Sequence, residues 1–198
     1  MRIVFHHIPK TGGASLVAAF KTFGPISYNS GDCSFLTTHL PYELSDYPER
    51  LHLTILRDPV ERLISWIRYK RTTLSPAGEL ARRLPASQFL RSDDVSVLHC
   101  ARDRQVRQLG GDFYTDPIPD DEALKRALVR LDGMFWVGET GTLDADMGRL
   151  FDQLGLTNPQ PDRWNVSEGP PDIDDMSVLE GLNVWDRRLI EGWHARSG

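Results

Sequence analysis

The stretch Phe5-His-His-Ile-Pro-Lys-Thr-Gly-Gly-Ala-Ser-Leu16 joins an apolar segment to the start of a helix through a glycine-rich turn. Residues Arg2 to Ile8 predict a short strand, and Gly12 and Gly13 permit a tight turn after it. Backbone N–H groups at the N-terminus of the following helix would point toward an anion. The helix dipole and the ammonium group of Lys10 would add to the attraction. The stretch therefore predicts a phosphate-binding loop at the end of a strand.

The spacing of this loop differs from that of the common nucleotide-binding loop. The common loop has a glycine, four residues, a second glycine, and then Lys and Ser or Thr. Here Lys10 precedes both glycines. The sequence therefore predicts a phosphate site other than a standard ATP site.

A second junction between strand and helix lies in Leu53-Thr-Ile-Leu-Arg-Asp-Pro-Val-Glu-Arg-Leu-Ile-Ser-Trp66. Asp58 is a favourable N-cap, and Pro59 suits the first helical position. Arg57 would lie at the carboxyl end of the strand, with Ser65 about two turns into the helix. An arginine and a hydroxyl so placed predict the site of a second phosphate.

Together the segments Pro9-Lys-Thr-Gly-Gly-Ala-Ser15 and Leu56-Arg-Asp-Pro-Val-Glu-Arg-Leu-Ile-Ser65 resemble the paired cofactor motifs of sulfotransferases. These enzymes use 3′-phosphoadenosine 5′-phosphosulfate (PAPS) as donor and release 3′-phosphoadenosine 5′-phosphate (PAP). The likeness is greatest to carbohydrate sulfotransferases, including the heparan sulfate 2-O-sulfotransferase group and its bacterial relatives. It covers about the first seventy residues. It implies a three-layer α/β/α fold with a mainly parallel sheet, similar to the P-loop nucleotide hydrolases.

The resemblance also implies roles for individual residues. The 5′-phosphosulfate would be held by the loop residues Lys10, Thr11, Gly12, Gly13, Ala14 and Ser15. Arg57 and Ser65 would hold the 3′-phosphate, and Lys10 would stabilise the charge that develops on the departing phosphate. Many relatives carry Thr where this chain has Ala14, so one hydroxyl contact is lost while the backbone N–H contacts remain. No metal is expected.

A general base is needed because the acceptor hydroxyl must lose its proton. His39 follows an apolar run and precedes a proline, where relatives carry a catalytic histidine, so His39 is the predicted base. The alternative is an exposed loop histidine without a role. His7 is a second candidate with a supporting role, and His6 is predicted to be structural.

The segment Arg104-Gln-Val-Arg-Gln-Leu-Gly-Gly111 is similar to a family segment in which Asn and Thr precede an arginine. Arg107 matches that arginine, but Asp103 and Val106 replace the Asn and the Thr. We therefore expect Arg107 to contact substrate or cofactor, or else to be an ordinary surface arginine before a Gly-Gly helix stop.

Residues 1–198 are expected to form one domain, with a helical insertion on the acceptor side at about residues 75–110. The pattern predicts helices over Pro76–Leu90, Val95–Leu109, Pro119–Leu131, Thr142–Leu154 and Val178–His194, and a buried strand over Met134–Gly138. Alternating strands and helices predict a parallel sheet with the site beyond the carboxyl ends of its strands. Residues Thr157 to Asp175 predict a surface loop, within which Trp164-Asn-Val-Ser167 either approaches the nucleotide or packs.

Composition excludes several classes of function. The net charge of −5 argues against general binding to nucleic acid, and no apolar run is long enough to cross a membrane. Two cysteines, Cys33 and Cys100, fit neither a metal motif nor a disulfide scaffold, so free thiols are expected. The N-terminus shows no leader, and a cytoplasmic, bacterial protein is expected. A basic cluster, which comprises Arg62, Arg68, Lys70 and Arg71, could flank the cofactor, steer an anionic acceptor or form a solvated helix face. The sequence contains no heptad repeat from which an oligomeric state could be predicted.

The sequence thus predicts a sulfotransferase that acts on a hydroxyl of a carbohydrate or small molecule. One alternative is a nucleotide or small-molecule kinase, which needs Mg²⁺ and an acidic ligand. Another is a catalytically silent domain that binds the desulfated nucleotide and a partner.

Overall fold

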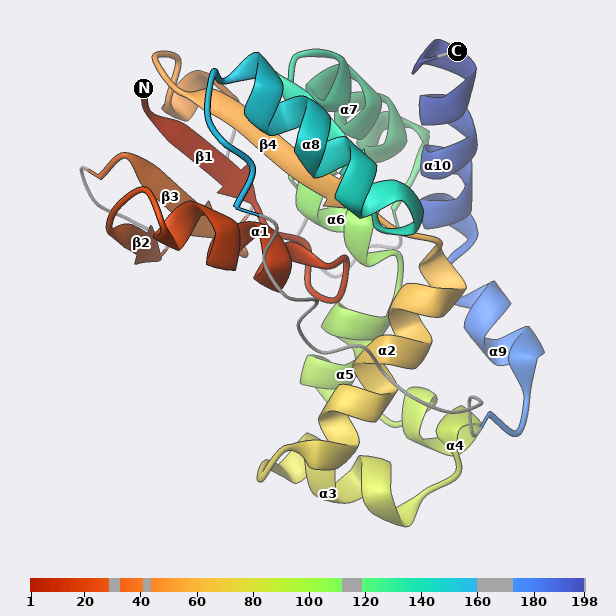
Figure 1. Cartoon of the computed structure of the whole chain (residues 1–198). Coiled ribbons are helices and arrows are strands. Elements are labelled where there is room, and N and C mark those ends of the chain that lie inside the picture. Colours follow the sequence, from red (N-terminus) through yellow and green to blue (C-terminus); the bar gives the residue numbers. More distant parts are fainter. Residues whose placement is uncertain (29–32, 41–43, 112–118, 160–172, 198) are drawn as a thin grey trace.

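A parallel sheet forms the centre of the computed structural model, which describes residues 1–28, 33–40, 44–111, 119–159 and 173–197 (Figure 1). Its five described strands are β1 (Ile3–His6), β2 (Ile26–Tyr28), β3 (Phe35–Thr38), β4 (Leu51–Leu56) and β5 (Trp136–Glu139). Their order across the sheet is β2-β3-β1-β4-β5, and every pairing is parallel. The prediction of an α/β fold with a parallel sheet is confirmed.

β1 lies in the middle of the sheet, where Ile3 pairs with Phe35 on one side and with Leu51 on the other. All four residues of β1 are buried, as expected for a parallel strand that is covered on both faces. β5 was predicted from the apolar run over Met134–Gly138 and spans Trp136–Glu139. β2 and β3 were not predicted as strands.

Ten described helices cover the faces of the sheet or lie beyond it. They are α1 (Gly13–Lys21), α2 (Pro59–Thr72), α3 (Pro76–Arg83), α4 (Ala86–Leu90), α5 (Val95–Ala101), α6 (Arg104–Gly110), α7 (Asp121–Asp132), α8 (Leu143–Gln153), α9 (Met176–Gly181) and α10 (Val184–Ser197), with 3-10 turns η1 (Leu44–Asp46) and η2 (Thr140–Thr142). The predicted helices at residues 119–131 and 142–154 correspond to α7 and α8.

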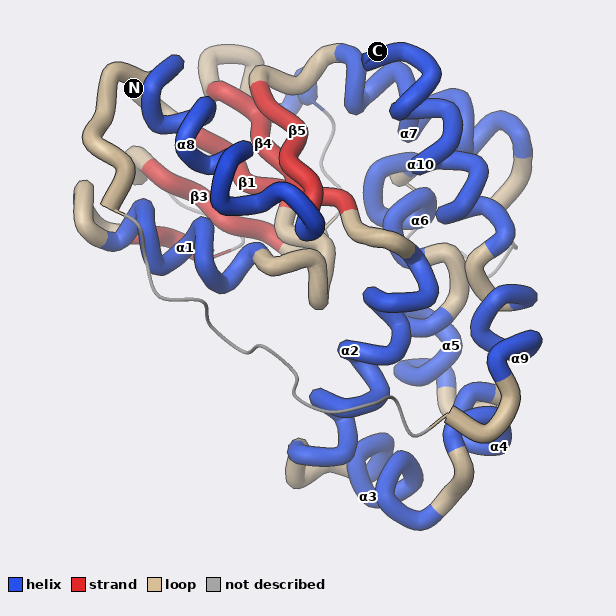
Figure 2. The backbone as a smooth tube through the Cα atoms, turned by 45° about the vertical axis from the view of Figure 1, so that its right-hand side comes forward, coloured by secondary structure: helices blue, strands red, loops and turns tan. Residues whose placement is uncertain are grey.

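Two apolar clusters hold helices on the two faces of the sheet. On one face Phe5 and Ile55 pack with residues of α1 and α8, among them Phe20 and Phe151. On the other face Ile8 and Leu56 pack with residues of α6, α7 and α10. The result is the layered α/β/α arrangement seen in Figure 2.

A third apolar cluster lies among α2, α3, α4, α5 and α9, which extend away from the sheet (Figures 1 and 2). Trp66 of α2 and Phe89 of α4 stack within it, with ring centroids 5.6 Å apart. These helices include most of the range 75–110 that was expected to form a helical insertion. α6, which also belongs to that range, instead contacts α7 and α10.

Three predicted helices are each broken in two. The first divides into α3 and α4 at Leu84, which is extended before Pro85, because a residue before proline disfavours the helical region. The second divides into α5 and α6 at Asp103, which has φ 43°. The third divides into α9 and α10, and the backbone N–H of Asp103 donates to the carbonyl of Leu182 at that break. The segment Trp164 to Ser167, which was predicted either to approach the nucleotide or to pack, lies outside the described residues.

Within the described residues no helix is both long enough and apolar enough to cross a membrane.

Candidate functional site

The two predicted motifs lie at neighbouring strand ends. β1 leads into the loop before α1, and β4, its direct neighbour, leads into α2. β3, on the other side of β1, ends one residue before His39. From β1 the chain builds the sheet first on one side, with β2 and β3, and then on the other, with β4 and β5. In open parallel sheets ligands bind beyond the carboxyl ends of the strands, where the strand order changes direction in this way.

The loop after β1 has a fixed conformation. Lys10 and Gly12 have left-handed backbone angles, with φ of 72° and 91°, and Gly12 is the N-cap of α1. The buried Thr11 hydroxyl donates to the carbonyl of Ile8 at 2.9 Å. Ala14 and Ser15 are half-buried in the first turn of the helix. Thr11 is directed inward and fully buried, so its hydroxyl holds the loop in place instead of facing a ligand.

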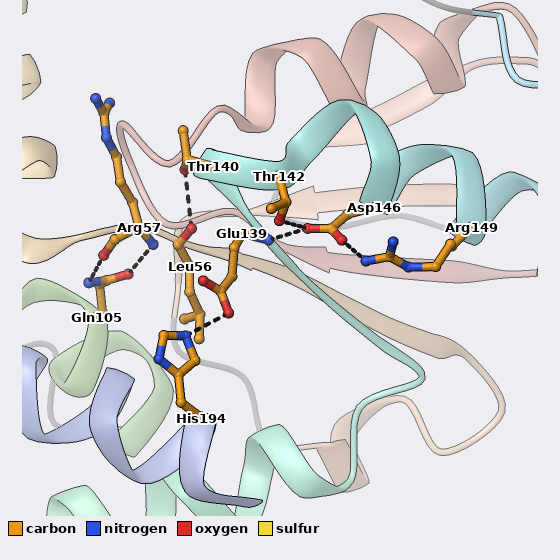
Figure 3. A network of polar contacts seen from close by, with 9 residues as sticks. All are labelled: Leu56, Arg57, Gln105, Glu139, Thr140, Thr142, Asp146, Arg149 and His194. Atoms are coloured by element: carbon orange, nitrogen blue, oxygen red, sulfur yellow. Dashed lines mark hydrogen bonds and ion pairs between the residues drawn. The ribbon is translucent and has the colours of Figure 1, made fainter. Parts of the chain in front are cut away.

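Arg57 connects the two motifs. Its Nη1 donates to the carbonyl of Lys10 at 3.1 Å, and its Nε lies 3.5 Å from the Glu61 carboxylate. The hydroxyl of Thr140, in the turn after β5, lies 2.7 Å from the carbonyl of Thr11 and 3.1 Å from that of Leu56. Figure 3 shows Thr140 above the end of β4, beside Arg57. Three strand ends are thereby held together.

The helix α2, which lies beside the loop, begins at the predicted residue. The Asp58 carboxylate accepts from the backbone N–H of Glu61 at 2.9 Å, and Pro59 opens the helix. Ser65, two turns on, is 6% exposed. Tyr69 follows four residues later on the same helical face, and the Lys10 ammonium lies 4.7 Å from its ring centroid. Tyr69 is a site residue that the sequence motifs did not predict.

Lys10 and Arg57 form the positive centre of the site. Desolvation, followed by the charge of Arg57, lowers the pKa of the Lys10 ammonium below its usual value. An incoming dianion would relieve the repulsion between the two cations. The pair therefore favours an anionic ligand.

His39 is exposed, and its hydrogen bond defines its tautomer. Nδ1 lies 2.8 Å from the carbonyl of His7, which can only accept, so Nδ1 carries the proton and Nε2 is left as the acceptor. Desolvation and the charge of Arg104 lower the pKa of His39, against an opposing effect of the bond to His7. The imidazole is therefore neutral at pH 7, as a general base requires.

His7 lies beneath the loop. Its ring stacks on Phe5 at 5.1 Å and lies 4.6 Å from the ring of His39. Burial, followed by the charges of His39 and Lys10, lowers its pKa to about 3, so the ring stays neutral. His6 lies in the core, where its Nε2 is 2.9 Å from Nδ1 of His52. His6 is buried, as expected for a structural residue, and the supporting role of His7 stays a prediction.

α6 contributes contacts that the sequence motifs did not predict. The Gln105 side chain bonds to the backbone of Arg57, and Nε2 of Gln108 donates to the carbonyl of His7 at 3.2 Å. Nη2 of Arg104 lies 3.2 Å from Oε1 of Gln108 and 3.4 Å from the carbonyl of His39. The only sequence signal was a group of polar residues at positions 104, 105 and 108, spaced to share one helical face.

Arg107 is 3% exposed, so its interpretation as a surface arginine was wrong. The expectation of a glycine helix stop after it is met by Gly111, which has φ 86°. Arg62 is fully buried and donates to the carbonyls of Cys100 and Ala101, both at 3.2 Å. None of the three interpretations of the basic cluster therefore applies to Arg62.

Both cysteines are free and half-buried, as predicted. Among the described parts of the chain, no group of three His, Cys, Asp or Glu side chains is placed to hold a metal ion. Comparison with family models and with curated proteins found no match for this chain. The functional argument therefore depends on the site itself and on the motif resemblance.

Proposed function

We propose that this protein is a PAPS-dependent sulfotransferase that acts on a hydroxyl group of a carbohydrate or small molecule. The observation that supports the proposal most is the hydrogen bond from Arg57 to the carbonyl of Lys10. It joins the two motif segments, 47 residues apart in the chain, at one edge of the sheet. Two separate anion-binding elements, a helix N-terminus and an arginine followed by a serine on the next helix, suit a nucleotide with two separate phosphates.

The bound donor would supply the sulfuryl group, whose sulfur gains a bond to the acceptor oxygen as its bond to the phosphate oxygen breaks. Nε2 of His39 takes the hydroxyl proton, while Nδ1–H remains bonded to the carbonyl of His7. Lys10 and the N–H groups at the start of α1 balance the charge left on the phosphate. Arg57 and Ser65 hold the 3′-phosphate.

Calorimetric titration tests the donor site directly. PAP is expected to bind without metal and more tightly than ATP with Mg²⁺, and Arg57→Ala should weaken PAP binding about tenfold or more. Arg83→Ala is the control, since Arg83 lies on α3 with its side chain 76% exposed. A preference for ATP with Mg²⁺, or an unchanged affinity in Arg57→Ala, would exclude the proposed function.

A second titration separates an enzyme from a nucleotide-binding module. His39→Ala should retain PAP affinity, because the His39 side chain is assigned to the acceptor and not to the donor. If wild type transfers sulfuryl groups to an acceptor, His39→Ala should lose that activity. A wild type that binds PAP and transfers to none of a broad panel of hydroxyl acceptors would favour the silent module.

A further inference from the structure

The side chain of Gln105 closes on the backbone of Arg57 from both directions. Its Oε1 accepts from the Arg57 N–H at 3.1 Å, and its Nε2 donates to the Arg57 carbonyl at 2.9 Å (Figure 3). Arg57 is the first residue after β4, so the amide makes the pair of hydrogen bonds that a neighbouring strand residue could make. Gln105 is fully buried, which shields both bonds from water.

Gln105 is itself fixed by two helix starts that cap each other. The Asp186 carboxylate of α10 accepts from the backbone N–H groups of Gln105 and Val106, at 3.1 and 2.8 Å. In return the Asp103 carboxylate accepts from the N–H groups of Trp185 and Asp186, at 2.8 and 3.1 Å. These four hydrogen bonds join the starts of α6 and α10 and fix the backbone that carries the Gln105 side chain.

The anchored backbone matters because of the side chain that it carries. A long, flexible arginine side chain loses rotamer entropy when it is ordered. Two further contacts, to the Lys10 carbonyl and to Glu61, hold the Arg57 side chain. Because Gln105 fixes the backbone of Arg57, the guanidinium group can occupy fewer positions before a phosphate binds. Such preorganisation raises affinity.

We propose that Gln105 is a positioning residue for Arg57, and that the arginine held in this way gives the site its selectivity for a 3′-phosphorylated nucleotide. The inference depends on the proposed function, since it assigns the 3′-phosphate to Arg57. It goes beyond that function by naming a residue outside both motifs as a determinant of donor selectivity.

The test compares PAP with 5′-AMP, which lacks the 3′-phosphate, by calorimetry on four proteins: wild type, Gln105→Met, Arg57→Ala and the double variant. Methionine keeps the length of the side chain and removes both hydrogen bonds. We expect Gln105→Met to lower the ratio of PAP to AMP affinity about tenfold, the effect of one well-placed hydrogen bond. The affinity for AMP should change less than about twofold, since the backbone loop that holds the 5′ group is untouched. The double variant should be no less selective than Arg57→Ala, because coupled residues are not additive.

Gln108→Met is the matched control, because it removes a buried amide from the same helix. The amide of Gln108 donates to His7 and does not contact Arg57. It should leave the ratio of the two affinities as in wild type. A general folding defect would weaken both nucleotides together, so the ratio separates positioning from stability. If Gln105→Met does not fold, Gln105→Glu, which keeps the length and the acceptor, takes its place with the same expectation.

Two results would overturn the inference: an unchanged ratio in the Gln105 variant, or a double variant less selective than Arg57→Ala. Failure of the proposed function is visible separately, because wild type itself would then not prefer PAP to AMP.

Discussion

At the scale of single residues, the space under the loop between β1 and α1 determines which side chains the loop accepts. A Cβ at position 13 would overlap the His7 ring and lie 2.9 Å from Cε1 of Phe5. Phe5 is fully buried and the half-buried His7 ring stacks on it, so a methyl group at position 13 requires packed rings to shift. We expect Gly13→Ala to lower the free energy of unfolding by about 1–3 kcal/mol and to weaken PAP binding. Urea unfolding and calorimetry measure the two effects.

Gly141→Ala is the control for that substitution. Gly141 lies in the 3-10 turn after β5, and a Cβ added there would meet no atom within 4 Å. Its free energy of unfolding should stay within about 0.5 kcal/mol of wild type. Equal stability of the Gly13 and Gly141 variants would show that His7 does not confine the loop.

The acid limb of the proposed reaction should reflect His39. The base must be neutral to accept a proton, and desolvation and Arg104 lower its pKa below the usual 6.5. We therefore expect kcat/KM to be constant from pH 7 to pH 8 and to fall only below pH 6.5, as His39 becomes protonated. A pH–rate profile checks this. An acid limb centred above pH 7 would contradict the assignment.

At the scale of elements, the reciprocal caps of α6 and α10 make stability depend on pH. Burial and the neighbouring Asp186 raise the pKa of Asp103 to about 7. Between pH 4 and pH 7 the folded state therefore holds a proton that the unfolded state has released. Asp103 thus stabilises the fold at low pH, and its contribution is lost as the pH rises through 7.

Asp103→Asn removes this titration and keeps an oxygen that accepts from Trp185 and Asp186. Asparagine also tolerates the φ of 43° at this position. The free energy of unfolding of the variant minus that of wild type should be about 1–3 kcal/mol larger at pH 8 than at pH 5. Urea unfolding at the two pH values measures the difference. A difference that does not change with pH would show that Asp103 does not titrate in this range.

Elements with local start signals were predicted well. The start of α2 at Asp58 and Pro59 is confirmed, and α7 begins after the cap Asp120, within two residues of its predicted start. The break at Asp103 has a different origin, because its stabilising partners, Leu182 and Asp186, lie about eighty residues away in the chain. No window of sequence contains both sides of that contact.

The same distinction applies to the site. Lys10, Gly12 and Arg57 lie in two contiguous motifs, and the fold brings them to neighbouring strand ends. Gln105 and Thr140 reach the motif backbones from elements 48 and more residues away. Neither side chain was identified as a site residue from the sequence, because the contact that gives it its role joins segments far apart in the chain. Contiguous chemistry was therefore predictable, and the residues that hold it in place were not.

At the scale of the whole molecule, the apolar cluster of α2–α5 and α9 is distinct from the two clusters on the sheet. Its separateness suggests that the outlying helices can open while the sheet stays folded. α2 belongs to this group and also presents Ser65 and Tyr69 to the site. Opening of the outlying helices would therefore remove part of the proposed donor site without unfolding the sheet.

Phe89→Ala tests this arrangement, because Phe89 is fully buried and stacks on Trp66 of α2. Its loss should cost about 3–5 kcal/mol within the outlying helices. Hydrogen exchange should then become faster for amides of α2–α5 while β1 and β4 keep their wild-type protection. Gln88→Ala, at the neighbouring exposed position of α4, is the control. Equal acceleration in the helices and in the sheet would mean that the chain opens as one cooperative unit. Substitutions in the outlying helices could then not change nucleotide binding without also destabilising the sheet.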